Sequence, residues 1–594
     1  MQRSDDPAAA TALAKLFTGP RAARGVVWFS LPGGRPLFRT GQEADTLYFL
    51  RSGRLGVMRE GHSGQPHLVS VIRPGEPAGE MALIAGVPHS ATVTALRDSE
   101  VLALSRDAFF AEARRHPEVM AELARLMVLR SRQANVAEAS NEPTVYGFAG
   151  VSSGARVRAL VEQIAQCAAD LGFSPIVIGS EHEHQSAEWF TRVERGHDLV
   201  LLAAEPGEAE WARMCARQVD RLFLVGRGDA PAPKELPAII RAAAQLHRLT
   251  DLILIQPEGI SRPVGSTAWC DAMSPVRLFH MRKGLAEDAR RLARVITGTS
   301  VGLALSGGGA RAYAHVGVIR ALKEAGEPID FVAGASMGAI VAAGVAMGWS
   351  MEEISDRIKD AFVSSNPLGD IDFPMVAMTR GRTVYSRLKA NFGDVEIADL
   401  WLPFFCTSSN LTTARHFVHQ RGKVSRALRA SAALPGILPP VVMGEDVLVD
   451  GAVMCNLPTD LMRSWHRGAV VGVDVAVAEG LTASDVARPP SLLKWLLSGE
   501  WRRGPPIVSI LIRAATAPTT RETAQAHEAA DLLIIPEIEG VELRDWRAFE
   551  PAVAAGHAAA KAALSRMEAP LTRLRATRAR ANARLFDFTA VGPE

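Results

Sequence analysis

The chain has 594 residues, with 66 Lys and Arg against 64 Asp and Glu, and 48% of its residues are hydrophobic. At about 150 residues per domain, this length predicts a multidomain protein. The formal net charge of +2 excludes a protein that binds nucleic acid over its whole surface, because such binding neutralises phosphates with Lys and Arg; no nucleic-acid partner is expected.

The cysteines and the N-terminus both point to the cytoplasm. Five cysteines lie far apart and without CxxC spacing, which argues against a disulfide framework and a cysteine-rich zinc site. The first residues, MQRSDDPAAATALAKLF, carry acids early and lack an apolar core that ends in a cleavage site. No secretory signal is predicted.

The first 138 residues are predicted to form a β-roll closed by a helix. Short apolar runs between Gly and Pro turns predict its strands: 25–31, 36–38, 46–51, 54–59, 68–72, 91–95 and 100–104. From Arg106 the apolar residues recur every three or four positions, which indicates a helix.

Residues 77–93, PAGEMALIAGVPHSATV, resemble the phosphate-binding cassette of cyclic-nucleotide-binding domains. The resemblance implies that Gly79 and Glu80 approach the ribose, and that the residue before Ser90 binds the cyclic phosphate through an arginine. Here that residue is His89. Because histidine is mostly neutral at pH 7 and lacks the planar fork of arginine, cyclic AMP and cyclic GMP are predicted to bind poorly. We expect a packing or regulatory module.

Residues 139–298 alternate apolar runs with amphipathic stretches, which predicts a Rossmann-like parallel α/β unit. A glycine pair, Gly150 and Gly154, follows its first strand, but the lysine and hydroxyl residues of a P-loop are missing. The run Glu181-His-Glu-His184 fits a polar loop better than a metal site. A scaffolding role is predicted, with no metal and no cofactor.

The third region, residues 299–563, begins with an apolar strand that ends in Gly307, Gly308 and Gly309 before a helix starts. Unpaired backbone N–H groups and the helix dipole make such a junction favourable for negative charge. A dinucleotide-binding GxGxxG pattern fails, because Ala312 stands at its last glycine. An anion-stabilising loop is predicted.

A GxSxG motif follows, with Ser336 between Gly334 and Gly338. Its surroundings, FVAGASMGAIVAAGVAMGWSM, are uncharged and as long as a membrane span. The early glycine and serine leave too short a helix to cross a bilayer, so we predict a strand, a sharp turn and a helix. This is the context of a nucleophile elbow.

A serine nucleophile needs a base, and Asp450 is the best candidate. It begins the sequence Asp450-Gly451-Ala452 at the end of an apolar strand. Three histidines after the serine were weighed for a triad, and none follows a strand as clearly: His416, His419 and His466. A Ser–Asp dyad is predicted.

Together, GGGAR, GxSxG and DGA in this order resemble the patatin-like phospholipase family over about residues 301–560. The resemblance extends to Asp330, to residues 430–440 and to residues 531–536. With the N-terminal roll, the architecture is similar to that of bacterial relatives of neuropathy target esterase. The implied catalytic domain is a three-layer α/β/α fold.

The resemblance implies that Ser336 attacks a fatty acyl ester, Asp450 is its base, and Gly307–Gly309 form the oxyanion hole beside Arg311. Phospholipid or lysophospholipid is the implied substrate. Two alternatives stay open: a nucleotide-responsive or interaction protein whose patatin-like domain does not turn over, and an acyltransferase that uses the same acyl-enzyme.

Two segments suggest a peripheral contact with the inner membrane. Residues 490–503, PSLLKWLLSGEWRR, are amphipathic with two tryptophans, although a helix packed on the catalytic domain explains them equally well. Residues 564–594 are predicted to be a basic helical tail whose arginines attract anionic lipid or form a solvated face.

Overall fold

A computed structural model of the chain describes residues 12–17, 23–60, 66–133, 144–185, 187–234, 250–364, 369–371, 376–476, 520–538, 540–543 and 545–575. The chain divides into two compact units. The first comprises Met1–Ile255 and Ala272–Arg277, and the second Gln256–Asp271 and Leu278–Glu594. The predicted amphipathic segment 490–503 and Arg578, Arg580 and Arg584 of the tail lie outside the described residues.

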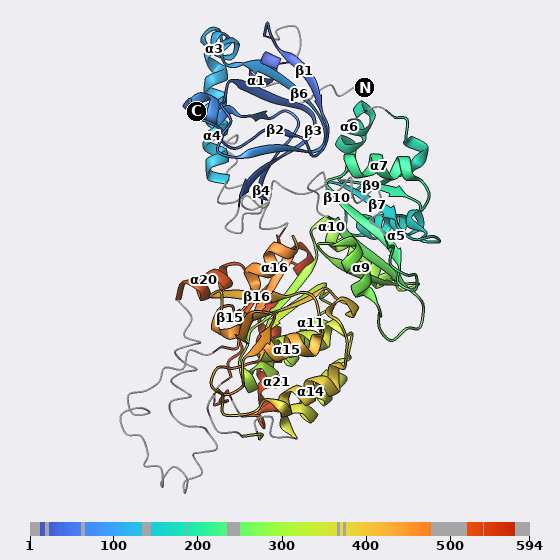
Figure 1. Ribbon diagram of the computed structural model, residues 1–594, viewed down its shortest axis with the longest axis vertical. Helices are drawn as coiled ribbons and strands as arrows, with labels where there is room; N and C mark the ends of the chain where they lie inside the picture. The colour runs from blue at the N-terminus through green and yellow to red at the C-terminus, as the bar shows by residue number, and fades with distance from the viewer. Residues whose placement is uncertain are drawn as a thin grey trace. The chain divides into compact units, whose positions relative to one another are not determined.

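The N-terminal part of the first unit is a β-roll, drawn in blue in Figure 1. Its strands are β1 (Val27–Leu31), β2 (Pro36–Phe38), β3 (Thr46–Glu60), β4 (Pro66–Ile72), β5 (Pro77–Ala78) and β6 (Thr92–Ser105). They form one antiparallel sheet with the path β1-β6-β3-β4. Its helices are α1 (Ala12–Phe17), α2 (Glu80–Ala85), α3 (Arg106–Arg115) and α4 (Pro117–Gln133).

Two pairs of predicted strands in the roll are single long strands, so the prediction of turns between them was wrong. β3 runs through Gly53, and β6 runs through residues 96–99. The register between β3 and β6 shifts around Ser52 and Arg54, and a Cβ on Gly53 would lie 2.3 Å from the Ser99 hydroxyl oxygen. A bulge has taken the place of the expected turn, because glycine permits either.

The predicted C-terminal helix of the roll is two helices. Ser105 caps α3 by accepting a hydrogen bond from the Ala108 N–H at 3.4 Å. Pro117 then begins α4. Proline cannot continue a helix but suits a first turn, so it separates the two helices here.

The middle region contains a six-stranded sheet in the order β12-β11-β10-β7-β9-β8. Its strands are β7 (Val145–Gly150), β8 (Pro175–Ile178), β9 (Leu199–Ala204), β10 (Arg221–Arg227), β11 (Thr250–Gln256) and β12 (Leu278–Arg282). The helical elements are α5 (Val157–Asp170), η2 (Ser180–His182), α6 (Ala187–Gly196), α7 (Ala209–Gln218), α9 (Ser266–Met273) and α10 (Ala286–Thr297). Neighbouring strands from β8 to β11 are parallel, as the alternating pattern predicts.

The second unit is built on an eight-stranded sheet with the path β17-β18-β15-β14-β13-β19-β20, and β16 pairs with β15. Its strands are β13 (Val301–Leu305), β14 (Phe331–Ala335), β15 (Phe404–Asn410), β16 (Arg415–His419), β17 (Val441–Met443), β18 (Asp446–Asp450), β19 (Ala469–Val473) and β20 (Leu532–Ile534). The central strands β15, β14, β13, β19 and β20 are parallel. Their carboxyl ends therefore share one edge of the sheet.

Helices connect these strands and pack on the sheet. They are η3 (Gly309–Tyr313), α11 (Ala314–Glu324), α12 (Ser336–Ala346), α13 (Met351–Ile358), the π-helical turn η4 (Lys359–Val363), α14 (Arg382–Phe392), η5 (Ile397–Asp399), α15 (Val424–Ser431), η6 (Gly451–Val453), α16 (Thr459–Trp465), α20 (Thr520–Glu528) and α21 (Phe549–Ser565). α11 and α21 approach closely: a Cβ on Gly317 would lie 1.9 Å from the Val553 carbonyl oxygen.

The uncharged stretch 331–351 forms β14, the turn at Ser336 and α12, as predicted. α12 ends at Ala346. Among the described residues, no helix has both the length and the apolar character needed to cross a membrane. The domain limits at residues 138, 298 and 563 stay predictions.

Candidate active site

Ser336 occupies the sharp turn from β14 to α12. Its φ of 53° lies in the left-handed region, which costs a side-chain-bearing residue energy and is typical of functional turns. The flanking glycines leave room for this turn. A Cβ on Gly334 would lie 2.6 Å from the Gly338 carbonyl carbon, and one on Gly338 would lie 2.3 Å from the Ser306 carbonyl oxygen. The GxSxG spacing therefore follows from packing.

The Ser336 hydroxyl donates a hydrogen bond of 2.6 Å to an Asp450 carboxylate oxygen. The other oxygen accepts from the Ala452 N–H at 2.8 Å. Asp450 is buried, and this burial raises the pKa of its carboxyl to about 6 despite both hydrogen bonds. Gly451 lets the chain turn here, because a Cβ would lie 2.4 Å from the Thr407 carbonyl oxygen. The arrangement can transfer a proton from serine to carboxylate.

Ser431 contacts Ser336, although no role is predicted for it from sequence. Its hydroxyl oxygen accepts from the Ser336 N–H at 2.9 Å, and its O–H donates to the Thr407 carbonyl at 2.7 Å. The Asp450 N–H donates to the Ala433 carbonyl at 2.9 Å. Residues 430–440, a run that carries part of the family resemblance, therefore contact both Ser336 and Asp450.

The glycine loop lies beside the serine. The Gly307 N–H donates to the Asn456 side-chain oxygen at 2.9 Å, so this N–H already has an acceptor. Within the part of the chain that the structure describes, the N–H groups of Gly308 and Gly309 have no acceptor. The Gly308 carbonyl accepts from the Arg311 N–H at 3.1 Å, which begins the first helical turn. Two backbone donors are thus available to a developing negative charge.

Arg311 is buried, and its side chain anchors the loop. Its Nε–H donates to the Val541 carbonyl at 2.7 Å. The neighbouring Ala310 N–H donates to the Leu543 carbonyl at 2.9 Å. Both contacts join the loop to the segment after β20. The predicted location of Arg311 beside the oxyanion hole stays a prediction.

His419 and His466 each share a hydrogen bond with a serine other than Ser336. The ring of His419 shares a hydrogen bond of 2.7 Å with the Ser408 hydroxyl, and burial lowers its pKa to about 4. His466 contacts the Ser300 hydroxyl at 3.1 Å, before the amino end of β13. His416 lies on β16, in register with Ser409. The structure brings Ser336 together with Asp450, and the Ser336 hydroxyl donates to this carboxylate rather than to a histidine.

In the cassette of the roll, His89 packs against neighbouring residues. The His89 ring stacks on Phe38 with centroids 3.7 Å apart, and a Cβ on Gly79 would lie 3.2 Å from the His89 Cε1 atom. Burial lowers the pKa of His89, which favours the neutral ring. Glu80 is buried and Ser90 is exposed. These contacts favour an internal packing role for His89.

After the glycine pair of the middle region, Gly150 and Gly154, the first N–H groups of the helix are bound by a side chain of the protein. The Glu205 carboxylate accepts from the Val157 N–H at 3.1 Å and from the Arg158 N–H at 2.8 Å. These are the first N–H groups of α5, where a nucleotide-binding fold would hold phosphate. A Cβ on Gly150 would lie 2.6 Å from Pro206, so packing explains this glycine.

The polar run at 181–184 starts within η2 and lies at or near the surface. Glu181 pairs with Arg158 at 3.0 Å, and the His182 ring stacks on Trp189 with centroids 4.9 Å apart. Nowhere in the described ranges do three His, Cys, Asp or Glu side chains come together in a way that could hold a metal ion.

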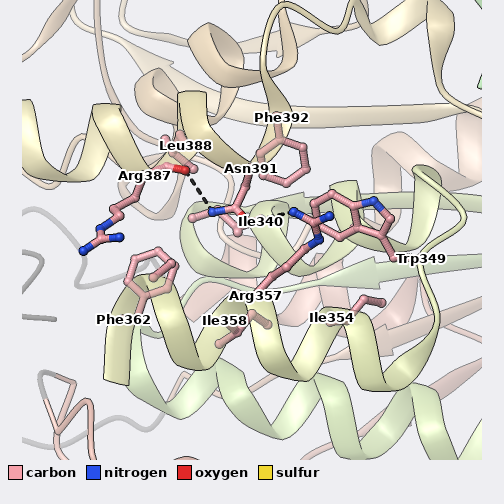
Figure 2. Close-up of a pocket in the computed structure, with 12 residues that line it drawn as sticks. Ile340, Trp349, Ile354, Arg357, Ile358, Phe362, Arg387, Leu388, Asn391 and Phe392 are labelled. Atoms are coloured by element: carbon pink, nitrogen blue, oxygen red, sulfur yellow. Dashed lines mark hydrogen bonds between the residues drawn. The ribbon is translucent and has the colours of Figure 1, made fainter. Parts of the chain in front are cut away.

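A small cavity lies beside α12, one turn after Ser336 (Figure 2). Ile340 of α12 lines it, and Arg357 crosses it to stack on Trp349 at 4.3 Å and donate to the Asn391 side-chain oxygen at 3.2 Å. Its volume is about 20 Å³, room for roughly one water. It is too small for a fatty acyl chain, so we assign it no substrate.

Family profiles match three segments of the chain. The profile described as Patatin-like phospholipase matches residues 303–463. The Cyclic nucleotide-binding domain profile matches residues 28–116, and the Neuropathy Target Esterase family P-loop like domain profile matches residues 157–299.

Curated relatives match most of the chain. An uncharacterized NTE family protein of Mycobacterium tuberculosis is 31% identical over 90% of this chain and 91% of its own length. Patatin-like phospholipase domain-containing protein 7 of Rattus norvegicus is 29% identical over 81% of this chain but only 40% of its own. Among solved structures, a cyclic nucleotide-binding-like protein from Brucella abortus is 36% identical over 15% of this chain and 74% of its own, with a TM-score of 0.14.

Proposed function

The chain belongs to the neuropathy target esterase family of patatin-like phospholipases, and from this premise we propose that it hydrolyses fatty acyl esters of phospholipids or lysophospholipids. Family membership supports a lipid hydrolase. The observation that carries the finer proposal is the 2.6 Å hydrogen bond from Ser336 to a buried Asp450 at a strained turn.

In the proposed reaction, Asp450 takes the proton of Ser336 as the serine oxygen attacks the ester carbonyl. The tetrahedral oxyanion receives hydrogen bonds from backbone N–H groups of the glycine loop, which are fixed in advance. Collapse expels the alcohol, protonated by Asp450, and leaves an acyl-enzyme. Water, deprotonated by the same carboxylate, then releases the fatty acid and restores Ser336.

The two alternatives predict different outcomes: the first makes no product, and the second makes a newly acylated one. A nucleotide-responsive protein without turnover is disfavoured by the contacts of Glu205 and His89, which fill the places where nucleotide phosphates would bind. An acyltransferase would use the same acyl-enzyme and pass the acyl group to an alcohol instead of water. Only the fate of the acyl group separates transfer from hydrolysis.

Lipid mass spectrometry tests the proposal. The purified protein and Ser336→Ala are incubated with a mixed bacterial phospholipid and lysophospholipid extract. We expect free fatty acid and deacylated lipid to accumulate with the wild type only. New acylated lipids without free fatty acid would favour transfer, and identical profiles for both proteins would refute the esterase.

A further inference from the structure

One peptide group next to Ser336 is held from both sides. The carbonyl oxygen of Ser306 accepts a hydrogen bond from the ring of His315 at 2.8 Å. The N–H of the same peptide, which belongs to Gly307, donates to the Asn456 side-chain oxygen at 2.9 Å. His315 comes from α11 and Asn456 from the segment after η6. The plane of this peptide is therefore fixed by two side chains that come from different segments.

Further contacts fix Ser306 to β19. Its N–H donates to the Val473 carbonyl at 3.0 Å, and its hydroxyl oxygen accepts from the Val475 N–H at 2.9 Å. The next residue has no spare room, because a Cβ on Gly307 would lie 2.8 Å from the Asn456 oxygen and 2.9 Å from the Ser336 Cβ. The peptide lies directly against the nucleophile.

The contact with Asn456 also changes which donors serve the oxyanion. Because the Gly307 N–H has an acceptor, the donors that remain in the loop are those of Gly308 and Gly309. Their directions depend on the orientation of the peptide that precedes them. We propose that Asn456 and His315 are positioning residues, which hold the Ser306–Gly307 peptide so that the Gly308 and Gly309 N–H groups point at the oxyanion. This inference rests on the proposed esterase function.

His315 is suited to this task. It is fully buried, and among the described residues its Nδ1 atom has no partner. Burial lowers its pKa to about 4, so the ring is neutral at working pH and carries one proton. The Ser306 carbonyl can only accept, which places that proton on Nε2. The ring therefore donates to this one carbonyl.

A competing explanation is that Asn456 acts directly, with its side-chain NH₂ donating to the oxyanion. The two roles predict different effects when Asn456 and His315 are replaced together. Two residues that fix one peptide act as a unit, so replacing the second lowers kcat little further once the first has been replaced. A direct donor would instead contribute independently of His315.

The test measures kcat and KM for a p-nitrophenyl ester with the full chain. Asn456→Leu keeps the side-chain size without the acceptor, and His315→Phe keeps a ring without the donor. A loop displaced by about 1 Å can cost on the order of a hundredfold in rate. We expect each variant to lose about ten- to a hundredfold in kcat with KM unchanged, and the double variant to resemble the worse single variant.

Three variants complete the design. In His315→Gln the side-chain amide restores a donor near the Nε2 position, so it is expected to recover most of kcat. Asn456→Ala repeats the acceptor test if the leucine variant fails to fold. Asn391→Leu is the matched control: it removes a hydrogen-bonded asparagine of α14 outside the site and is expected to leave kcat unchanged.

The outcomes separate the two proposals. Labelling of Ser336 by a fluorophosphonate, absent in Ser336→Ala, establishes the nucleophile whatever the other variants do. An active wild type with unchanged kcat in Asn456→Leu and His315→Phe overturns the positioning role alone. Losses that multiply in the double variant, or that fall on KM, also overturn it. A wild type that is neither labelled nor active overturns the esterase and the positioning role together.

Discussion

Two glycine loops in this chain follow buried parallel strands and precede helices, yet they differ in what meets their backbone N–H groups. After β7, the Glu205 carboxylate accepts from the first two N–H groups of α5 at 3.1 and 2.8 Å. After β13, the N–H groups of Gly308 and Gly309 have no acceptor among the described residues. The first loop carries its own anion, and the second is open to one.

The difference shows that glycine spacing can predict where backbone N–H groups lie at a helix start. It does not predict whether a side chain of the protein already accepts from them. Whether a helix start can bind an anion depends on side chains that come from elsewhere in the chain. In the roll, His89 packs against Phe38 and Gly79, at the position where the family resemblance implies a phosphate-binding arginine. An acidic or aromatic side chain of the protein itself can close a site that its motif suggests.

The largest effect should come from removing the proposed base, Asp450. Asp450→Asn keeps the side-chain size but cannot accept the proton of Ser336 at 2.6 Å. We expect ester hydrolysis to fall by at least about a thousandfold, as in other serine hydrolases that lose a member of the catalytic unit. Steady-state kinetics measures this, with circular dichroism as the folding check. A folded variant with activity within tenfold of wild type would contradict the dyad.

Matched alanine substitutions in the two loops test the comparison directly. A Cβ on Gly309 would lie 2.2 Å from the Leu543 carbonyl oxygen, and its φ is 55°, so Gly309→Ala must displace the loop. Loss of one oxyanion donor costs on the order of a hundredfold in kcat. Gly154 has a φ of 77°, and a Cβ there would lie 3.2 Å from the Arg227 side chain, which can move aside. Gly154→Ala should lower stability by about 1 kcal/mol and leave kcat unchanged.

Equal kcat losses in the two variants would remove the distinction between the loops. Thermal unfolding of both proteins shows whether the Gly309 variant loses activity because it has unfolded. A folded Gly309→Ala protein with wild-type kcat would show that this N–H does not serve the oxyanion.

Much of the open site could be predicted from sequence, because its parts are local. The strand, the turn at Ser336 and the helix follow from 21 consecutive uncharged residues, and the turn needs its glycines for packing. Asp450 could be predicted because it follows an apolar strand. The predicted family membership is confirmed by a relative that covers 90% of the chain. The roles of Ser336 and Asp450 stay predictions.

The parts that could not be predicted are contacts between distant segments. Glu205 lies 48 residues after the N–H of Val157 that it meets. Asn456 lies 149 residues after Gly307, and Ser431 lies 95 residues after Ser336. The run of residues 430–440 was a signal for the last of these, but without a role. In the roll, Gly53 lies in a bulge inside β3, because the pairing with β6 outweighs the local tendency to turn.

The pH dependence tests the proposed base of the open site. Burial raises the pKa of Asp450 from 3.8 to about 6, and only the ionised form can accept the serine proton. For an uncharged ester, we expect kcat/KM to be flat above pH 7 and to fall about tenfold per pH unit below 6. A profile that stays flat down to pH 5 would show that Asp450 is not the base, or that its pKa is not raised.

The roll offers a test with a smaller expected effect, in which His89 of the cassette is replaced. His89 offers no planar cationic fork, so calorimetry should find weak binding of cyclic AMP and cyclic GMP by the wild type. His89→Arg supplies the fork, and we expect at least about tenfold tighter binding. His116→Arg adds the same charge elsewhere in this unit, at an exposed position, and serves as the control. Tight binding of either cyclic nucleotide by the wild type would contradict the predicted weak binding.

The smallest expected effect comes from opening the closed loop. Glu205→Ala frees the N–H groups of Val157 and Arg158, which in the wild type donate to the Glu205 carboxylate. Loss of such a cap costs about 1 kcal/mol of stability. Glu210→Ala removes another glutamate nearby in sequence, on the exposed face of α7, and should change stability by less than about 0.5 kcal/mol.

Inorganic phosphate then separates a closed loop from one that never binds anions. If Glu205 occupies an anion site, phosphate should raise the melting temperature of Glu205→Ala more than that of the wild type or Glu210→Ala, because a ligand stabilises only the folded protein that binds it. An equal response in all three would mean that the loop lacks the geometry for an anion. In that case Glu205 is a helix cap alone, and the two glycine loops differ in shape as well as in occupancy.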